Sequence, residues 1–302
     1  MKSLFTALLV CLLLPLAAAE YWASGVSLEG GWYDANKTFA PGDADREMCW
    51  AASAANIIDW WQHEHVDLME KSGVDPALRE PDAVWHLLRD SFEDARGFAV
   101  YGMAWYFLDL FPVPEPPLTE YGKGRGGYYR HAVMDEVLTT EESLSLIPQP
   151  ITMADEGVDA QVLALKLRDV LESGRPLSLI LGGNETVHAA TLWGGVFDDA
   201  TGMPLTLYLT DSDDDTLRTA FDVPQIFSAN VDLIEATVPG TLDPTPVLRI
   251  TSFIVDELPW YPWYGDDMYI LGASFLGFPY PVPEPTTLPL LALAALAARR
   301  RK

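Results

Sequence analysis

Cys49 is the residue of this sequence with the clearest potential for chemistry. It lies between a polar, turn-prone segment, residues 41–45, and an Ala-rich apolar run, residues 50–61. That run has high helix propensity and a broad apolar face, so the sequence predicts a buried helix that begins at or just after Cys49. Unpaired N–H groups and the positive end of the helix dipole favour a thiolate there. Cys49 is therefore a candidate nucleophile, with a small core cysteine as the alternative.

His188 and Asp211 are candidates for the base and the acid that a thiol nucleophile needs. His188 opens one apolar stretch, and the next apolar stretch ends at Asp211 and Asp213. Two adjacent strands joined by a turn at residues 198–203 would bring His188 near Asp211. A buried core histidine remains the alternative for His188 alone. The order Cys, His, Asp along the chain is that of papain-like thiol peptidases.

Metal sites have weaker support in the sequence. His63 and His65 are two residues apart, so they point to different sides of a helix and fit a solvated helix end better. His86 and His131 have no acidic partner at a diagnostic spacing. The acidic segment 211–215 lacks the glycine that a calcium loop has at its sixth position, so a calcium-binding module is a minor alternative. We expect the protein to need no cofactor.

The elements that must position these residues fall into two groups. Helical patterns cover residues 49–71, 76–95, 97–110 and 159–173, whereas short runs of β-branched and aromatic residues cover 177–181, 187–197, 205–210, 231–238 and 247–255. The sequence therefore predicts an α+β fold, with helices in the N-terminal half and a mainly antiparallel sheet in the C-terminal half. Without repeats or a clear linker, we expect one domain over residues 20–281.

The first 19 residues are typical of a signal peptide. A basic Lys2, an apolar run and the small residues 17–19 precede a cleavage site after Ala19. The mature chain would then keep Cys49 as its single cysteine and form no internal disulfide, although its destination is oxidising. An unpaired thiol in an exported protein is a candidate reactive group.

The charge excludes some partners. The chain has 19 basic and 44 acidic residues, a net charge of −25, and five of the basic residues lie in the two terminal segments. Such a surface repels nucleic acid and anionic membranes, so we expect no nucleic-acid partner.

The C-terminal segment 282–302 has three parts in sequence: Val282-Pro283-Glu284-Pro285, an apolar run of about 13 residues, and the basic cluster 299–302. The run is shorter than the ~20 residues that span a bilayer. This segment closely resembles the PEP-CTERM sorting tail of Gram-negative bacteria. The resemblance implies a transient inner-membrane association, processing by an exosortase-type enzyme, and delivery to the cell surface or the medium.

Four blocks of the sequence resemble the IdeS/Mac-type cysteine endopeptidases, which are known for cleaving immunoglobulin G. They are GWYDANKTF at 31–39, CWAASAANIIDWW at 49–61, Arg125-Gly126-Gly127, and HAATLWGGVFDDATGMPLTLYLTDSDDD at 188–215. The resemblance implies a papain-like fold and hydrolysis of protein substrates. It also implies the role of each site residue: Cys49 as nucleophile, His188 as base, Asp211 as the residue that orients it, Asp213 as a supporting acid, and Lys37 as a donor to the oxyanion.

Lys37 fills a gap in this interpretation, because no glutamine precedes Cys49 to stabilise the oxyanion as in papain-type enzymes. The alternative for Lys37 is a solvated surface lysine. A second function class also stays open: a surface-sorted binding protein on an inactive peptidase-like scaffold. The sequence leaves the substrate open, including whether immunoglobulin is a target.

Overall fold

The computed structural model describes the greater part of the chain. The described residues are 18–37, 45–110, 126–153, 158–183, 187–212, 226–237, 244–255, 258–260 and 268–277. Asp213, Arg125, most of the predicted signal peptide and the C-terminal segment lie outside them. Within the described residues, no helix is long and apolar enough to cross a membrane.

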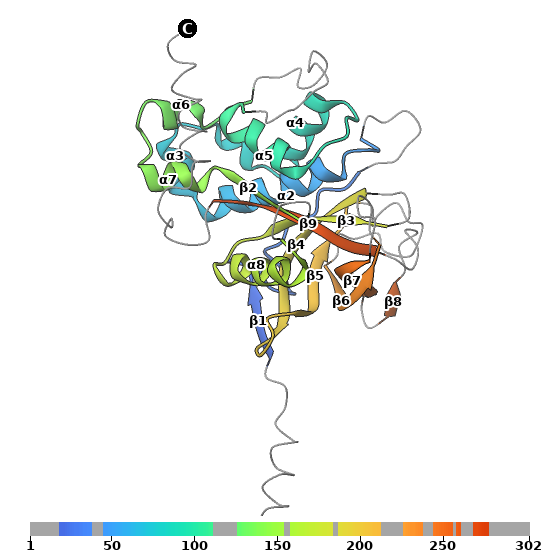
Figure 1. Cartoon of the computed structure of the whole chain (residues 1–302). Helices are drawn as coiled ribbons and strands as arrows, with labels where there is room; N and C mark the ends of the chain where they lie inside the picture. The colour runs from blue at the N-terminus through green and yellow to red at the C-terminus, as the bar shows by residue number, and fades with distance from the viewer. Residues whose placement is uncertain are drawn as a thin grey trace, which may run out of the picture.

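Most helices pack on one side of the sheet (Figure 1). They are α2 (Cys49–Glu64), α3 (Val66–Lys71), the 3-10 turn η1 (Pro76–Arg79), α4 (Ala83–Phe92), α5 (Ala99–Leu108), α6 (Arg130–Met134) and α7 (Thr140–Ser145). Helix α8 (Ala160–Glu172) lies on the other side, against the strands. Its start is fixed by Asp159, whose side chain accepts a hydrogen bond from the N–H of Val162 at 2.8 Å.

The strands form one antiparallel sheet that closes on itself. They are β1 (Ala18–Trp22), β2 (Pro148–Thr152), β3 (Leu177–Gly182), β4 (Val187–Asp198), β5 (Pro204–Thr210), β6 (Phe227–Ala236), β7 (Thr245–Val255), β8 (Leu258–Trp260) and β9 (Met268–Leu276). From β3 to β7 the neighbours follow in sequence order, and β9 pairs with both β3 and β7. Strands β3, β4, β5, β6, β7 and β9 thereby make a closed six-stranded antiparallel barrel.

The predicted papain-like α+β fold is therefore wrong, because the C-terminal half is a closed barrel and not simply an antiparallel sheet beside helices. Closure depends on β9, a strand that the sequence pattern does not predict. Gly272 interrupts its apolar run, and glycine weakens a strand signal. A Cβ at this position would lie 2.5 Å from the carbonyl oxygen of Ile151, so the glycine allows β2 to approach β9.

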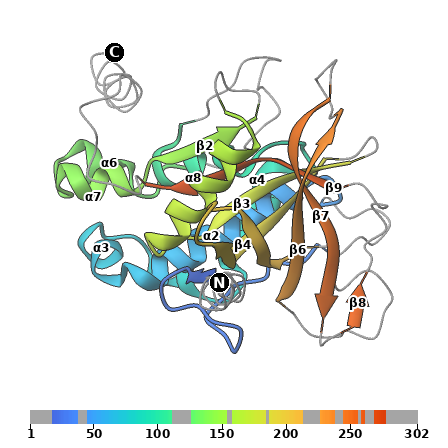
Figure 2. The ribbon, with the colours of Figure 1, turned by 60° about the horizontal axis from the view of Figure 1, so that its bottom comes forward.

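Helix α2 lies at the centre of the molecule and crosses β3 and β4 (Figure 2). Thirteen of its sixteen residues are buried, which explains its apolar sequence. One hydrophobic core joins α2 to α4, α5 and the facing side of β4, where Ala189 and Trp193 take part. A second core fills the space between the barrel strands and α8, with Ala190 and Leu192 on the opposite face of β4.

Strand β1 includes the last two residues of the predicted signal peptide. Residues 18–22 pair with β4 in antiparallel register, from Ala18 opposite Asp198 to Trp22 opposite Gly194. The Trp22 ring stacks on Tyr208 with 4.5 Å between centroids. Cleavage after Ala19 would leave Glu20 to Trp22 in this strand, and the cleavage site stays a prediction.

Candidate active site

Cys49 is the first residue of α2, and its side chain is partly exposed. The residue before it, Met48, is fully buried and caps the helix without a side-chain hydrogen bond. The first turn of α2 has no acidic side chain. The N–H groups at the helix start therefore face no competing carboxylate from this turn, and together with the dipole they favour a negative charge on the sulfur.

His188 connects Cys49 to Asp211. It lies at the start of β4, opposite Leu181 of β3, and Asp211 follows the last residue of β5. The ring Nε2 and the Oδ1 of Asp211 are 2.7 Å apart, and both side chains are buried. The same imidazole hydrogen-bonds the Cys49 side chain. Because Asp211 occupies Nε2, Nδ1 is the nitrogen left for the thiol.

The electrostatics of this cluster favour a charged imidazole. Burial lowers the pKa of His188, but the carboxylate of Asp211 and the charge and hydrogen bond of Cys49 outweigh burial, so the pKa lies well above the usual value. A histidine with a raised pKa beside a thiol at a helix start favours an imidazolium next to a thiolate.

Lys37 is buried, with 2% of its surface exposed. Its ammonium donates a hydrogen bond to the carbonyl of Arg46 at 3.0 Å, three residues before Cys49. Its backbone N–H donates to the carbonyl of Ser212 at 2.9 Å, next to Asp211. These two bonds place Lys37 between the turn that leads into α2 and the end of β5, which excludes the solvated surface lysine of the alternative.

Comparison with known proteins relates part of this sequence to a family. Residues 19–92, from β1 to the end of α4, match the Mac 1 family. The chain is also 27% identical over 217 residues to the IgM protease of Streptococcus suis (strain P1/7), a match that covers 61% of this chain and 18% of that protein. The chain carries a Mac 1-type region. The predicted resemblance to IdeS/Mac-type proteases is thus confirmed, and the chain spans less than a fifth of this relative's length.

The C-terminus gives a second match. Residues 281–302 match the PEP-CTERM protein-sorting motif, which confirms the predicted tail. This motif implies export, sorting to the surface and processing by an exosortase. It lies outside the described residues, as does the apolar run within it.

The Mac 1-type region contains Lys37 and Cys49, whereas His188 and Asp211 lie outside it. Asp213, the predicted supporting acid, lies outside the described residues, and so does most of the acidic segment 211–215. No group of three or more histidine, cysteine or acidic side chains suitable for a metal ion occurs among the residues that the structure describes.

Three of the other four histidines have local roles away from this cluster. His63 pairs through Nδ1 with the carbonyl of Asp59 at 2.9 Å. His65 separates α2 from α3, and burial lowers its pKa. His131 contacts the carbonyl of Ser72 through Nε2 at 2.6 Å.

Sequence reasoning misses a buried polar network that fixes α2 to β4. Asn56 donates to the hydroxyl of Thr191 at 3.0 Å, and Thr191 donates to the hydroxyl of Ser53 at 3.0 Å. The amide oxygen of Asn56 accepts the N–H of Ala35 at 2.8 Å. The network thus links the helix of Cys49, the strand of His188 and the segment that leads to Lys37. Its one signal in the sequence is the presence of Ser and Asn inside an Ala-rich apolar helix.

Trp50 is a second residue whose role the structure reveals. Its side chain is buried, donates from the indole N–H to the carbonyl of Ala95 at 2.8 Å, and meets Phe92 edge-on at 5.2 Å between centroids. A Cβ at Gly97 would lie 2.8 Å from the indole ring. Trp50 therefore anchors the first turn of α2 in the core and holds the adjacent Cys49 in place.

Proposed function

We propose that the protein is an exported cysteine endopeptidase in which Cys49 is the nucleophile, His188 the general base and acid, and Asp211 the residue that orients His188. The observation that carries this proposal is the position of the buried His188 ring between two partners. The ring bonds Asp211 through Nε2, and it also bonds the Cys49 side chain. A nucleophile, a base and an orienting acid in one chain of hydrogen bonds are what covalent acyl transfer needs.

The reaction begins with the thiolate of Cys49 and the imidazolium of His188. The sulfur attacks a peptide carbonyl carbon, and the carbonyl electron pair moves to oxygen to give a tetrahedral oxyanion. As the oxyanion collapses, the C–N bond breaks and His188 gives its proton to the leaving amine. His188 then takes a proton from water, and the hydroxide attacks the thioester carbon. The C–S bond breaks, which releases the acid product and restores the Cys49 thiolate beside the His188 imidazolium.

The oxyanion requires donors near the start of α2. The backbone N–H of Cys49 is one, and we assign the ammonium of Lys37 as the second. Its burial and its bond to the carbonyl of Arg46, in the turn before Cys49, support this role. A buried ammonium that needs little reorganisation stabilises a developing negative charge strongly. Asp213 is the proposed supporting acid next to Asp211.

Proteins are the proposed substrate class. The relative of similar sequence is named an IgM protease, and this supports testing intact immunoglobulins first. Its much greater length leaves room for recognition surfaces that this chain does not share, so a mixed proteome is needed as a parallel substrate.

The proposed organisation has three parts. Residues 1–19 form a signal peptide, residues 20–281 form the catalytic unit, and residues 282–302 form the sorting segment that holds the protein transiently at the inner membrane. The sorting motif at residues 281–302 supports the last part.

The experiment compares the purified mature chain with Cys49→Ala. Both are incubated with intact immunoglobulin and with a mixed proteome, and new chain termini are identified by mass spectrometry. We expect new termini from the mature chain alone, while Cys49→Ala keeps its fold because alanine is small and favours helices. Cleavage by Cys49→Ala would refute the peptidase. An absence of cleavage together with failure of a thiol-directed affinity label to react at Cys49 would favour a binding protein on an inactive scaffold.

A further inference from the structure

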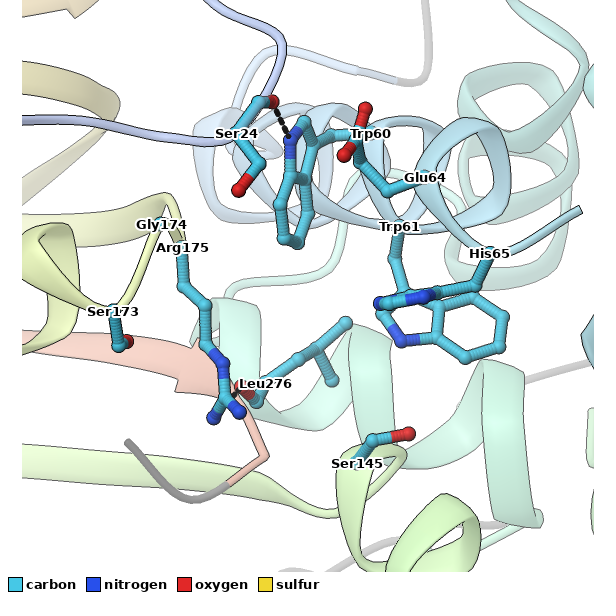
Figure 3. A pocket seen from close by; sticks show the side chains of 10 residues that line it. All are labelled: Ser24, Trp60, Trp61, Glu64, His65, Ser145, Ser173, Gly174, Arg175 and Leu276. Carbon is cyan, nitrogen blue, oxygen red and sulfur yellow. Dashed lines mark hydrogen bonds between the residues drawn. The ribbon is translucent and has the colours of Figure 1, made fainter. Parts of the chain in front are cut away.

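A cavity of about 200 Å³, with both polar and apolar walls, lies at the end of α2 opposite to Cys49 (Figure 3). Trp60 lines it eleven residues after Cys49, about 17 Å along the helix axis at 1.5 Å per residue. Its walls come from five parts of the chain: the end of α2, the end of α7, the turn after α8, the end of β9 and the residue Ser24. The cavity is therefore separate from the proposed catalytic cluster.

Arg175 is the cation of this cavity. Its guanidinium donates one hydrogen bond, from Nη1 to the carbonyl of Leu276 at 3.3 Å, and no acidic side chain of the described residues forms an ion pair with it. The side chain is half-buried, and this burial lowers its pKa. A guanidinium has five N–H donors, so most of them are available to a ligand.

Trp61 adds a second donor. Its side chain is 1% exposed, and its indole Nε1 has no hydrogen-bond partner among the residues that the structure describes. A buried N–H without a partner costs about 1–3 kcal/mol, so an acceptor that reaches this N–H gains that much. Figure 3 shows the Trp61 ring beside His65, across the cavity from Arg175.

The remaining walls select the ligand further. Trp60 and Leu276 are buried apolar walls, while the Glu64 carboxylate turns away from Arg175, toward Ser24 (Figure 3). The hydroxyls of Ser145 and Ser173 donate to the carbonyls of Glu142 and Val170, so toward the cavity they offer lone pairs only. The N–H donors thus favour an anion, and the apolar walls favour an organic body on it.

We propose that this cavity binds a small organic carboxylate, held by Arg175 and the indole N–H of Trp61, with its apolar part against Trp60 and Leu276. Guanidinium and carboxylate match as a two-point pair. A volume of about 200 Å³ lies below the roughly 300–1,000 Å³ of typical ligand clefts, so the ligand is of the size of one amino-acid side chain. It is either a free acid or the carboxylate that ends a peptide.

Calorimetric titration of the mature chain tests this proposal without using peptidase activity. The probes are phenylacetate, its neutral isostere phenylacetamide, and the tripeptide Gly-Gly-Phe with a free or an amidated C-terminus. We expect saturable binding of at least one carboxylate and at least tenfold weaker binding of its amide. Binding of phenylacetate alone identifies a free acid as the ligand, and binding of the tripeptide alone identifies a chain terminus.

Two variants and a control locate the site. Arg175→Gln should weaken carboxylate binding at least tenfold, and Trp61→Phe, which keeps most of the ring, should weaken it by about tenfold or more for one lost hydrogen bond to a charged acceptor. The control is Arg168→Gln, on α8 but outside the cavity, which should bind as the unaltered chain does. No saturable binding at about 10 mM, where a 1 mM site would be mostly filled, overturns the proposal. Equal binding of acid and amide, or unchanged binding by both variants, also overturns it.

Discussion

Replacing Lys37 by methionine tests the least conventional part of the proposed mechanism. Methionine keeps an unbranched stem of similar length but removes the ammonium. If that ammonium stabilises the oxyanion, kcat should fall by roughly 10²–10³-fold, or about 3–4 kcal/mol, the usual loss for one oxyanion donor. KM should change little, because the negative charge that Lys37 meets exists only in the transition state.

The structure also predicts a cost in stability. The ammonium donates to the carbonyl of Arg46 at 3.0 Å inside a buried region, and the methionine would leave this carbonyl without that donor. Such a loss costs about 1–3 kcal/mol. The free energy of unfolding must therefore be measured by denaturant titration for each variant, and kcat must be measured where both proteins are folded.

A matched control separates catalysis from general effects of losing a lysine. Lys71 lies on α3, is exposed and pairs with Glu142 at 2.7 Å. Lys71→Met should change stability little, as for other surface pairs, and should leave both kinetic constants unchanged. A wild-type kcat with a raised KM in Lys37→Met would assign Lys37 to substrate binding. If kcat of Lys37→Met falls only in proportion to the fraction of unfolded protein, Lys37 has a structural role alone.

Three further predictions follow from the fold and the tail. Asn56→Ala should lower the free energy of unfolding by about 1–3 kcal/mol, because it leaves the N–H of Ala35 without its acceptor; an unchanged denaturation midpoint would contradict the network. Burial and then the charge of Asp82 raise the pKa of Asp59 well above its usual value, so the folded state holds this proton more tightly than the unfolded state, and stability is lost as the pH rises through the folded pKa. Asp59→Asn should therefore gain stability over the parent chain increasingly as the pH rises from about 4, the pKa of an unfolded aspartate, toward the raised folded pKa, and parallel pH profiles would refute this. Mass spectrometry of the exported protein should find no residues beyond about Pro285, whereas an intact C-terminus would show that the tail is a plain anchor.

Local sequence signals predict the longer helices, but not the short helices α6 and α7. The run from Cys49 gives α2 at its first residue, and the pattern over 159–173 gives α8, whose cap Asp159 the structure reveals. The prediction of one helix over 49–71 misses the break at His65, whose backbone leaves the helical region. At this break the rings of Trp61 and His65 pack against each other, with 4.9 Å between their centroids. Helix propensity does not predict such a break, because the propensity of single residues contains no information on side-chain packing.

The proximity of His188 and Asp211 is predictable because it needs only one hairpin, β4 to β5. Barrel closure is not, because it joins β9 to β3 across a long separation in sequence, and such a pairing leaves little trace in a local pattern. The contacts of Lys37 depend on the same long-range arrangement, since its backbone reaches Ser212. Residue types thus indicate which side chains are candidates for catalysis, while the tertiary fold determines which of them come into contact.

The alanines of α2 show how the fold sets the position of Cys49, the proposed nucleophile. Alanine favours a helix, but the alanines of α2 have a second role. Because the helix is buried on nearly all sides, its small residues set the distance between α2 and the elements packed against it. A Cβ at Gly102 of α5 would lie 3.0 Å from the Cβ of Ala54, so these two positions have little room for growth. On the opposite side, Ser53 and Asn56 bond Thr191 of β4. Helix α2 is therefore held between α5 and the strand of His188, and the contact between Cys49 and His188 is fixed by core packing and not by a mobile loop.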